Sequence, residues 1–314
     1  MKGAAQVSTN GTYSKRFSVN LRKYGPIWLF LLPTLIYFLV FVYFPMYGAQ
    51  IAFKDFIPVK GIQGSPWVGF KHFTRFFNSP YFSEILGNTL ILSIYSLVVG
   101  FPLPIAFALM LNYQKNLKFK KIVQTASYAP HFISVVVVCG MILLFTSPSS
   151  GIINTLIKAL GGEPIHFMGK AKYFRHIYVW TGIWQDLGWS AIIYIGALAG
   201  VSPELHEAAM VDGATIWQRI WHIDIPGILP TIIILLIMNA GSILGVGFEK
   251  TYLLQNDMNT KYSEVISTYV YKTGLSKAQY SYGSAIGLFN STVNFLILTV
   301  VNSIANRVGS TSLF

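Results

Sequence analysis

The sequence is divided into long apolar segments joined by polar connections, and this pattern constrains the fold more than any other feature. Of the 314 residues, 53% are hydrophobic and only 11% are charged, whereas soluble domains carry about 25% charged residues. A helix needs about 20 consecutive apolar residues to cross the hydrocarbon of a bilayer. Lipid also leaves unpaired backbone groups without partners, which excludes open strands. The pattern therefore predicts an all-α integral membrane protein.

Six segments are long and apolar enough to span a membrane. They lie near residues 27–48, 85–111, 122–145, 177–199, 227–247 and 283–305. We therefore expect six transmembrane helices in a single transmembrane domain over residues 27–307. A polar, basic tail at 1–26 precedes this domain, and a short tail at 308–314 follows it.

The distribution of Lys and Arg indicates the orientation of the chain. Six spans place both termini on one side, which holds 11 Lys and Arg against 12 on the other side. Short connections decide orientation more than long ones do. The shortest and densest connection, at 112–121, holds four lysines, so we expect it to face the cytoplasm. The predicted location is the plasma or inner cell membrane, with both termini in the cytoplasm.

One polar connection, at residues 202–226, holds four of the 11 acidic residues. Its sequence "HEAAM" begins like the zinc-protease motif H-E-x-x-H, which needs two His one helical turn apart. Met210 stands at the second ligand position and Ile216 at the third. A single imidazole cannot make a zinc site, so the sequence predicts no metal.

The same connection has the signals of two short helices joined by a turn. Ser202 can cap a helix, Pro203 suits its first position, and Glu204 favours its positive end. Gly213 can adopt a positive φ angle and turn the chain into a second helix that carries Trp217. Large aromatic side chains are typical of interface hot spots, so we expect this helix–turn–helix knob to dock into another protein. An ordinary loop that lies on its own protein is the alternative.

The stretch "EAAMVDGATIWQRIWHIDIPGILP" resembles the signature of binding-protein-dependent ABC importer permeases, in which E-A-A, D-G-A and I-x-x-P recur at this spacing. The matching residues are Glu207, Ala208, Ala209, Asp212, Gly213, Ala214, Ile223, Pro226 and Pro230. The stretches "FEKTYLLQN" and "ISTYVYKTGL", and most of the chain before the signature, are similar to the polysaccharide-uptake branch of carbohydrate permeases. Asp224 departs from the signature, which usually has an uncharged residue there.

The resemblance implies the fold of a type I ABC importer permease and a mechanism. The knob would be a cytoplasmic coupling helix between spans 4 and 5, seated in a separate ATP-hydrolysing subunit. The residues implied in this coupling are Glu207, Ala208, Ala209, Asp212, Gly213, Ala214 and Trp217. The chain has no phosphate-binding loop, so it would not be an enzyme, and ATP and Mg would be bound by two copies of the partner ATPase. A second homologous permease would complete a heterodimer, and an extracytoplasmic binding protein would deliver an oligosaccharide. Membrane lipid is a further expected partner, and nucleic acid is not.

Candidate substrate contacts lie in the fourth predicted span. Asp186 is the only acidic residue deep in a predicted span, and such groups are costly and usually functional. Trp189 lies three residues further on and shares its helix face, so the two could hydrogen-bond and stack on a sugar. Gln185, Trp184 and Asn239 are further candidates. Hydrogen bonding between helices and an interfacial aromatic belt are the structural alternatives.

Charge suggests the kind of sugar. The predicted outer connections hold 12 Lys and Arg against six acidic residues, and a positive entrance attracts anions. We therefore expect the sugar to be a uronate-bearing oligosaccharide, such as a pectin or alginate fragment. Two other classes stay open: an ion-driven secondary sugar transporter, and a membrane enzyme with an intramembrane active site at Asp186.

Overall fold

A computed structural model describes residues 10–308, with the side chains of residues 24–307 except residue 171. The α-helices are α1 (Asn10–Phe38), α2 (Phe44–Met46), α3 (Gly61–Gly64), α4 (Lys71–Phe77), α5 (Phe82–Gly100), α6 (Pro102–Asn112), α7 (Leu117–Tyr128), α8 (Val135–Phe145), α9 (Ile152–Ala159), α10 (Ala171–Leu198), α11 (Pro203–Val211), α12 (Ile216–Arg219), α13 (Ile225–Ala240), α14 (Phe248–Leu254), α15 (Thr260–Ser263), α16 (Ile266–Val270) and α17 (Tyr280–Val308).

Shorter helical turns of other kinds join these helices. The π-helical turns are η1 (Leu39–Tyr43), η6 (Ile220–Asp224) and η7 (Tyr271–Ser276), and the 3₁₀ turns are η2 (Tyr47–Phe53), η3 (Pro58–Lys60), η4 (Ala129–Phe132) and η5 (Phe167–Gly169). Within residues 10–308 there is no strand, and a single antiparallel bridge joins Lys54 and Trp67. The expectation of an all-α chain is therefore confirmed for the described residues.

Helices occupy most of each of the six segments that were predicted to span the membrane. By length and hydropathy, four helical stretches of the described chain qualify as spans, and a bent pair would make a fifth. The four are Tyr24–Phe53, Phe82–Asn112, Ile216–Ala240 and Tyr280–Arg307. Helix α10, which covers the predicted fourth span, is long enough at 28 residues but does not belong to these four. Its Gln185 and Asp186 make it less apolar than its neighbours.

The third predicted span differs from the continuous helix that the sequence indicated. The chain bends by 97° between the helical stretches Leu117–Phe132 and Val135–Phe145. Ile133 and Ser134 adopt extended backbone angles at the break, and the Ser134 side chain accepts a hydrogen bond from the backbone N–H of Val137. Ser134 therefore starts α8 as a new helix in a new direction, because an N-cap residue leaves the helical conformation.

The fifth predicted span is shorter than expected. Helix α13 ends at Ala240, and the residues at 241–247 form turns that lead into α14. The end of the apolar run is therefore not helical. It passes beside α10 and α17 instead of continuing through the bilayer as one rod.

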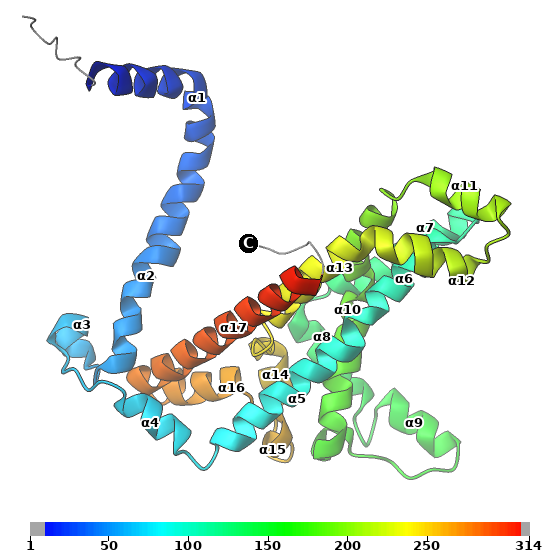
Figure 1. The fold of residues 1–314 in the computed structure, drawn as a ribbon. Coiled ribbons are helices and arrows are strands. Elements are labelled where there is room, and N and C mark those ends of the chain that lie inside the picture. The colour runs from blue at the N-terminus through cyan, green and yellow to red at the C-terminus, as the bar shows by residue number, and fades with distance from the viewer. Residues whose placement is uncertain (1–9, 309–314) are drawn as a thin grey trace, which may run out of the picture.

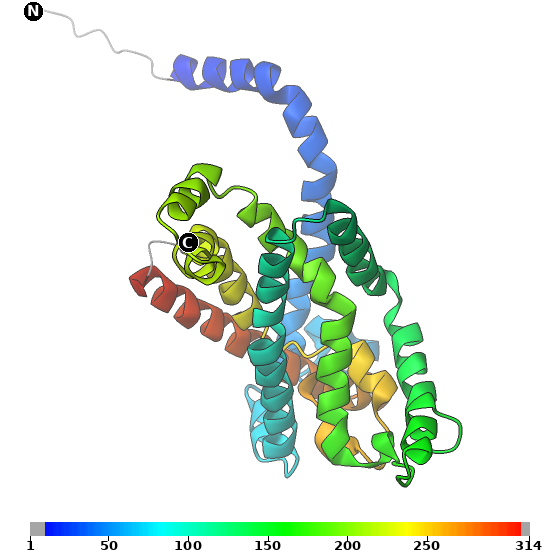
Figure 2. The same ribbon diagram turned by 90° about the vertical axis from the view of Figure 1, so that its right-hand side faces the viewer.

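The helices form a body with a separate amino-terminal arm (Figure 1). Helices α5, α6, α8, α10, α13, α14, α16 and α17 make up most of the body, and the arm of α1 and α2 rises clear of it. The apolar stretch Tyr24–Phe53 has no buried residue in its most hydrophobic window. In two perpendicular views α11, α12, the carboxyl-terminal end of α17 and the amino-terminal part of α1 lie toward the same end of the molecule (Figure 2). Helices α4, α9 and α15 lie at the opposite end.

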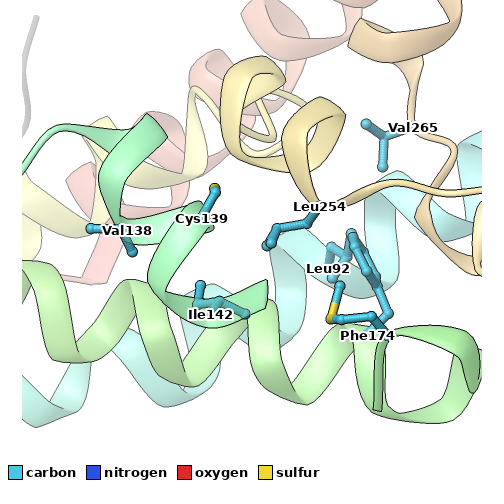
Figure 3. Close-up of a cluster of buried hydrophobic side chains, with 8 residues drawn as sticks. Leu92, Val138, Cys139, Ile142, Phe174, Leu254 and Val265 are labelled. Carbon is cyan, nitrogen blue, oxygen red and sulfur yellow. The ribbon is translucent and has the colours of Figure 1, made fainter. Parts of the chain in front are cut away.

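Buried apolar side chains join the helices of the body in distinct clusters. Figure 3 shows one of them, where side chains from α5, α8, α10 and α14 meet. It comprises Leu92, Val138, Cys139, Ile142, Met168, Phe174, Leu254 and Val265. Cys139 lies here as a small packing residue, because its side chain is surrounded by apolar neighbours.

A second cluster fixes the end of the body next to the knob. It joins α6, α10 and α13 through the buried residues Ala108, Leu109, Ala191, Tyr194, Leu198 and Ile228. Val201 and Ile220 pack against this cluster from the two ends of the knob segment. Burying apolar surface stabilises this packing by about 25 cal/mol per Å². Both ends of the knob are therefore held against the body.

Candidate functional site

A cavity of about 750 Å³ lies among α5, α6, α10, α13 and the turns that precede α14. Binding sites for small molecules usually enclose about 300–1,000 Å³. Helix α10 supplies one wall, and Ser93 and Ser96 of α5 lie on another. The cavity therefore sits between the packed helices of the body, where transport proteins bind their substrates.

The structure gathers four of the five predicted substrate residues on this cavity. Asp186, Trp189, Gln185 and Asn239 all line it. On α10 this follows from helical spacing, since residues three and four apart share a face. Trp184 points elsewhere: it does not line the cavity, and its side chain is 47% exposed.

The carboxylate of Asp186 has a partner that the sequence did not indicate. His131 Nδ1, from η4 at the bend before α8, lies 2.8 Å from Asp186 Oδ1. The His131 ring also stacks on Trp189, with ring centroids 4.3 Å apart and planes 4° apart. One face of the indole is therefore covered by the imidazole, while 44% of the Trp189 surface remains exposed.

The contact between the bend and α10 depends on a glycine. A Cβ atom on Gly188 would overlap the carbonyl oxygen of Ser127, near the end of α7. Only glycine allows two helix backbones to approach this closely. The close crossing brings His131 within reach of Trp189, so the bend and the cavity wall are built together.

Two of the predicted residues use their amide groups within the protein. The Gln185 Nε2 atom donates to the Ile133 carbonyl at 2.9 Å, and the Gln185 side chain is buried. The Asn239 Nδ2 atom donates to the Leu235 carbonyl of its own helix at 2.7 Å. The Gln185 bond joins two segments and matches the structural alternative, whereas the Asn239 bond stays within α13; both residues still border the cavity.

Lys250 lies in the cavity wall, a position that the sequence analysis did not predict. It is buried, with only 9% of its surface exposed, and it lines the cavity. Its Nζ atom donates to the Tyr178 carbonyl at 3.0 Å and lies 5.0 Å from the centre of the Tyr178 ring. Sequence reasoning missed this placement because neighbouring Glu249 and Lys250 after an apolar run are also typical of a membrane boundary.

The knob has the local structure that its sequence predicted. Helix α11 starts after Ser202, whose side chain accepts a hydrogen bond from the Glu204 N–H at 3.3 Å. Gly213 has a φ angle of 76°, in the region that favours glycine. Thr215 then caps α12 in a capping box with Gln218. The turn is therefore specified by local chemistry on both sides.

The outer surface of the knob is apolar and exposed. Val211 is 88% exposed and Trp217 is 72% exposed, and Trp221 is exposed beside them. Of the residues in the signature, Glu207, Ala208, Asp212 and Gly213 are also exposed, while Ala209 and Ala214 are half-buried. An apolar patch of this kind at the end of a molecule marks an interaction surface.

A buried carboxylate ties the knob to the end of α6. The Tyr113 hydroxyl donates to Asp224 Oδ2 at 2.6 Å, and His206 Nε2 lies 3.4 Å from Asp224 Oδ1. Asp224 is fully buried, and the Arg219 guanidinium lies 5.3 Å from the centre of the Tyr113 ring. Burial and the neighbouring carboxylate raise the pKa of Tyr113 well above its usual range, so the phenol keeps its proton and donates at neutral pH.

Asp224 is the residue at which the chain departs from the signature. Its surroundings explain how a charge is accommodated there, since it accepts from a phenol and faces an imidazole. The exit from the knob into α13 is a π-helical turn, η6, with Asp224 at its end. Within the described residues no group of three or more His, Cys, Asp or Glu side chains could hold a metal ion.

The part of the chain that holds the cavity and the knob matches known proteins. A family model described as "Binding-protein-dependent transport system inner membrane component" matches residues 100–310. The chain is 43% identical over 300 residues to the polygalacturonan/rhamnogalacturonan transport system permease protein YteP of Bacillus subtilis (strain 168), covering 96% of this chain and 94% of that protein. It is 43% identical over 288 residues to protein LplB of the same organism, covering 92% of this chain and 91% of that protein.

A solved structure has the same fold. A chain of a bacterial alginate ABC transporter, in complex with an alginate pentasaccharide-bound periplasmic protein, superimposes with a TM-score of 0.88. It is 40% identical, and the match covers 95% of this chain and 100% of that chain. This likeness confirms the predicted type I ABC importer permease fold and argues against an ion-driven transporter or a membrane enzyme. The chain belongs to the family of binding-protein-dependent transport system inner membrane components.

Proposed function

We propose that this chain is the permease subunit of an ATP-driven importer for acidic oligosaccharides, which an extracytoplasmic binding protein delivers. The observation that carries the proposal is the similarity to the alginate transporter chain over 95% of this chain. The relative named for polygalacturonan and rhamnogalacturonan transport supports the same substrate class. All three of these sugars contain uronate residues with carboxylate groups.

The cavity supports this substrate class through its side chains. Trp189 offers one free indole face to the C–H groups of a sugar ring, and Asp186 can accept hydrogen bonds from sugar hydroxyls. Gln185 and Asn239 border the same space with their remaining acceptor atoms. The surplus of Lys and Arg in the outer connections would attract an anionic oligomer to the entrance.

The knob supports the coupling to ATP hydrolysis. In this proposal its apolar surface seats in a cleft of a separate ATPase subunit, with Glu207 forming a charged contact and Trp217 an aromatic anchor. Ala208 and Ala209 leave room for the partner, and Gly213 holds the turn between Asp212 and Ala214. The two ATPase copies would bind ATP and Mg, because this chain contains no phosphate-binding loop.

The proposal also orients the chain. The knob faces the cytoplasm, and both termini lie on the same side, as the common position of α11, α12 and the ends of the helical chain suggests (Figure 2). A second, homologous permease would pair with this one. The exposed apolar arm at Tyr24–Phe53 has room for lipid or for this second subunit.

Uptake by the reconstituted complex tests the proposal. The complex of both permeases, the ATPase and the binding protein would be placed in lipid vesicles, and import of trigalacturonate and of neutral maltotriose would be measured with and without ATP. We expect ATP-dependent import of trigalacturonate that also requires the binding protein. Import without ATP, or a preference for maltotriose, would contradict the proposed function.

A further inference from the structure

The ammonium group of Lys250 occupies an unusual position for a charge. Lys250 lies on α14 directly after the turns at 241–247, and 9% of its surface is exposed. Lysine is almost never fully buried unless it is paired, because taking a charge out of water is costly. The side chain nevertheless lines the cavity that the helices enclose.

The protein satisfies this charge only in part. An ammonium group has three N–H donors, and one of them reaches the Tyr178 carbonyl. The Tyr178 ring contributes its electron-rich face at 5.0 Å. Among the residues that the structure describes, none of the ion pairs includes Lys250. Asp186, an acid of α10 that lines the same cavity, is already engaged by His131.

The opposite wall leaves room at the ammonium group. Gly182 of α10 lines the cavity one helical turn before Asp186, and a Cβ atom on Gly182 would lie 3.3 Å from Lys250 Nζ. A side chain larger than hydrogen at this position would therefore crowd the ammonium. With glycine there, Lys250 and Trp189 both line the same cavity.

We infer that Lys250 is the residue that binds a substrate carboxylate within this cavity. A uronate carboxylate would accept the free N–H donors of Nζ, while the sugar ring lies along the wall of α10. Hydrogen bonds between an ammonium and a carboxylate are about twice as strong as neutral ones. The inference rests on the proposed function, and it adds that selection for acidic sugars occurs inside the membrane domain as well as at the binding protein.

The test compares two sugars of one shape that differ in charge. Import of trigalacturonate and of its trimethyl ester would be measured with the full complex in vesicles, for the wild type and for Lys250→Gln and Lys250→Arg. We expect Lys250→Gln to raise the half-saturation concentration for trigalacturonate about tenfold and to leave that of the ester within about twofold. Lys250→Arg keeps the charge and should retain most of the preference for the acid.

Two controls separate the possible outcomes. Lys118→Gln removes a charge from an exposed lysine of the predicted cytoplasmic connection, outside the cavity, and import of both sugars should stay unchanged. Amounts of each variant in the membrane would be matched by immunoblot. If Lys250→Gln lowers import of both sugars equally, or of neither, the carboxylate subsite is wrong while the proposed function stands. A wild-type complex that prefers the ester, or imports neither sugar, would contradict the proposed function and this subsite together.

Discussion

The imidazole of His131 lies flat on the indole of Trp189, with ring centroids 4.3 Å apart and planes 4° apart. His131 lies in the helical stretch directly before the 97° bend, and Trp189 lies on α10 in the cavity wall. The same imidazole lies within hydrogen-bond distance of Asp186 at 2.8 Å. One side chain therefore closes a face of the aromatic ring, engages the nearest carboxylate and connects the bend to α10.

We expect His131→Ala to weaken import of acidic sugars more than import of neutral ones. The substitution leaves the Asp186 carboxylate without its partner, and a free anion on the wall repels a uronate. The half-saturation concentration for trigalacturonate should rise several-fold more than that for its trimethyl ester. In a chain that also carries Asp186→Asn, His131→Ala should no longer affect trigalacturonate more than its ester, because the two side chains act as a pair. If His131→Ala raises the half-saturation concentration for trigalacturonate equally with and without Asp186→Asn, this pairing is contradicted.

Trp189→Ala should weaken import of acidic and neutral oligomers alike. The substitution removes the one exposed aromatic face on α10 that borders the cavity, and we expect a loss of about tenfold in apparent affinity. Trp184→Ala is the matched control, since Trp184 is equally exposed on the same helix but does not line the cavity. Import kinetics for both variants check the prediction. A larger effect of Trp184→Ala would place the sugar elsewhere.

Gly213→Ala should uncouple ATP hydrolysis from transport. Nothing lies within 4 Å of the position of the new Cβ atom, so the effect comes from the backbone, which has a φ angle of 76°. The left-handed conformation costs about 1–2 kcal/mol in a residue with a side chain. The turn then relaxes and the knob changes shape. ATPase activity stimulated by the loaded binding protein should fall, while the amount of permease in the membrane stays the same.

Gly213→Asn tests whether the backbone conformation is the cause. Asparagine tolerates the left-handed region better than alanine does, so this variant should keep more of the coupling. Glu207→Lys, which reverses a charge on the exposed side of α11, should abolish stimulation without changing the turn. Unchanged stimulation in both Gly213→Ala and Glu207→Lys would show that the knob does not contact the ATPase.

Tyr113→Phe should destabilise the end of the body that holds the knob. The variant leaves the buried Asp224 carboxylate without its phenol donor, which we expect to cost about 1–2 kcal/mol because Tyr113 is only half-buried. Thermal unfolding of the purified complex would detect the loss. Tyr128→Phe provides the control, since no hydrogen bond to a carboxylate is lost there.

The pH dependence of this difference follows from the pKa of Tyr113. The pKa is raised in the folded chain, so the protonated phenol is the form that folding favours. The stabilisation is fully present below the ordinary tyrosine pKa of about 10 and is lost as the pH rises through the raised value. The difference between the wild type and Tyr113→Phe should therefore be constant from about pH 6 to 9 and decrease only above about pH 10. A difference that changes near neutral pH would contradict this assignment.

Local signals in the sequence were sufficient for most of the helices and for the knob, but not for the break at Ile133 and Ser134 or for the end of α13 at Ala240. Apolar run length predicted where helices lie, because lipid forces backbone groups to pair within a segment. Ser202, Pro203 and Gly213 act on backbone groups within a few residues, so their capping and turning roles could be predicted without knowledge of the fold. The face of α10 that carries Asp186 and Trp189 follows from helical spacing in the same way.

Contacts between distant segments were decided only by the tertiary structure. His131 meets Asp186 across 55 residues, Lys250 meets Tyr178 across 72, and Tyr113 meets Asp224 across 111. Each pair depends on how closely two helices cross, which a single sequence does not encode as a local pattern. The close approach at Gly188 and the 97° bend before α8 set the first of these distances. The sequence by itself therefore determined most of the helices, the turn of the knob and the shared face of Asp186 and Trp189, whereas packing decided which side chains of other segments join them at the cavity.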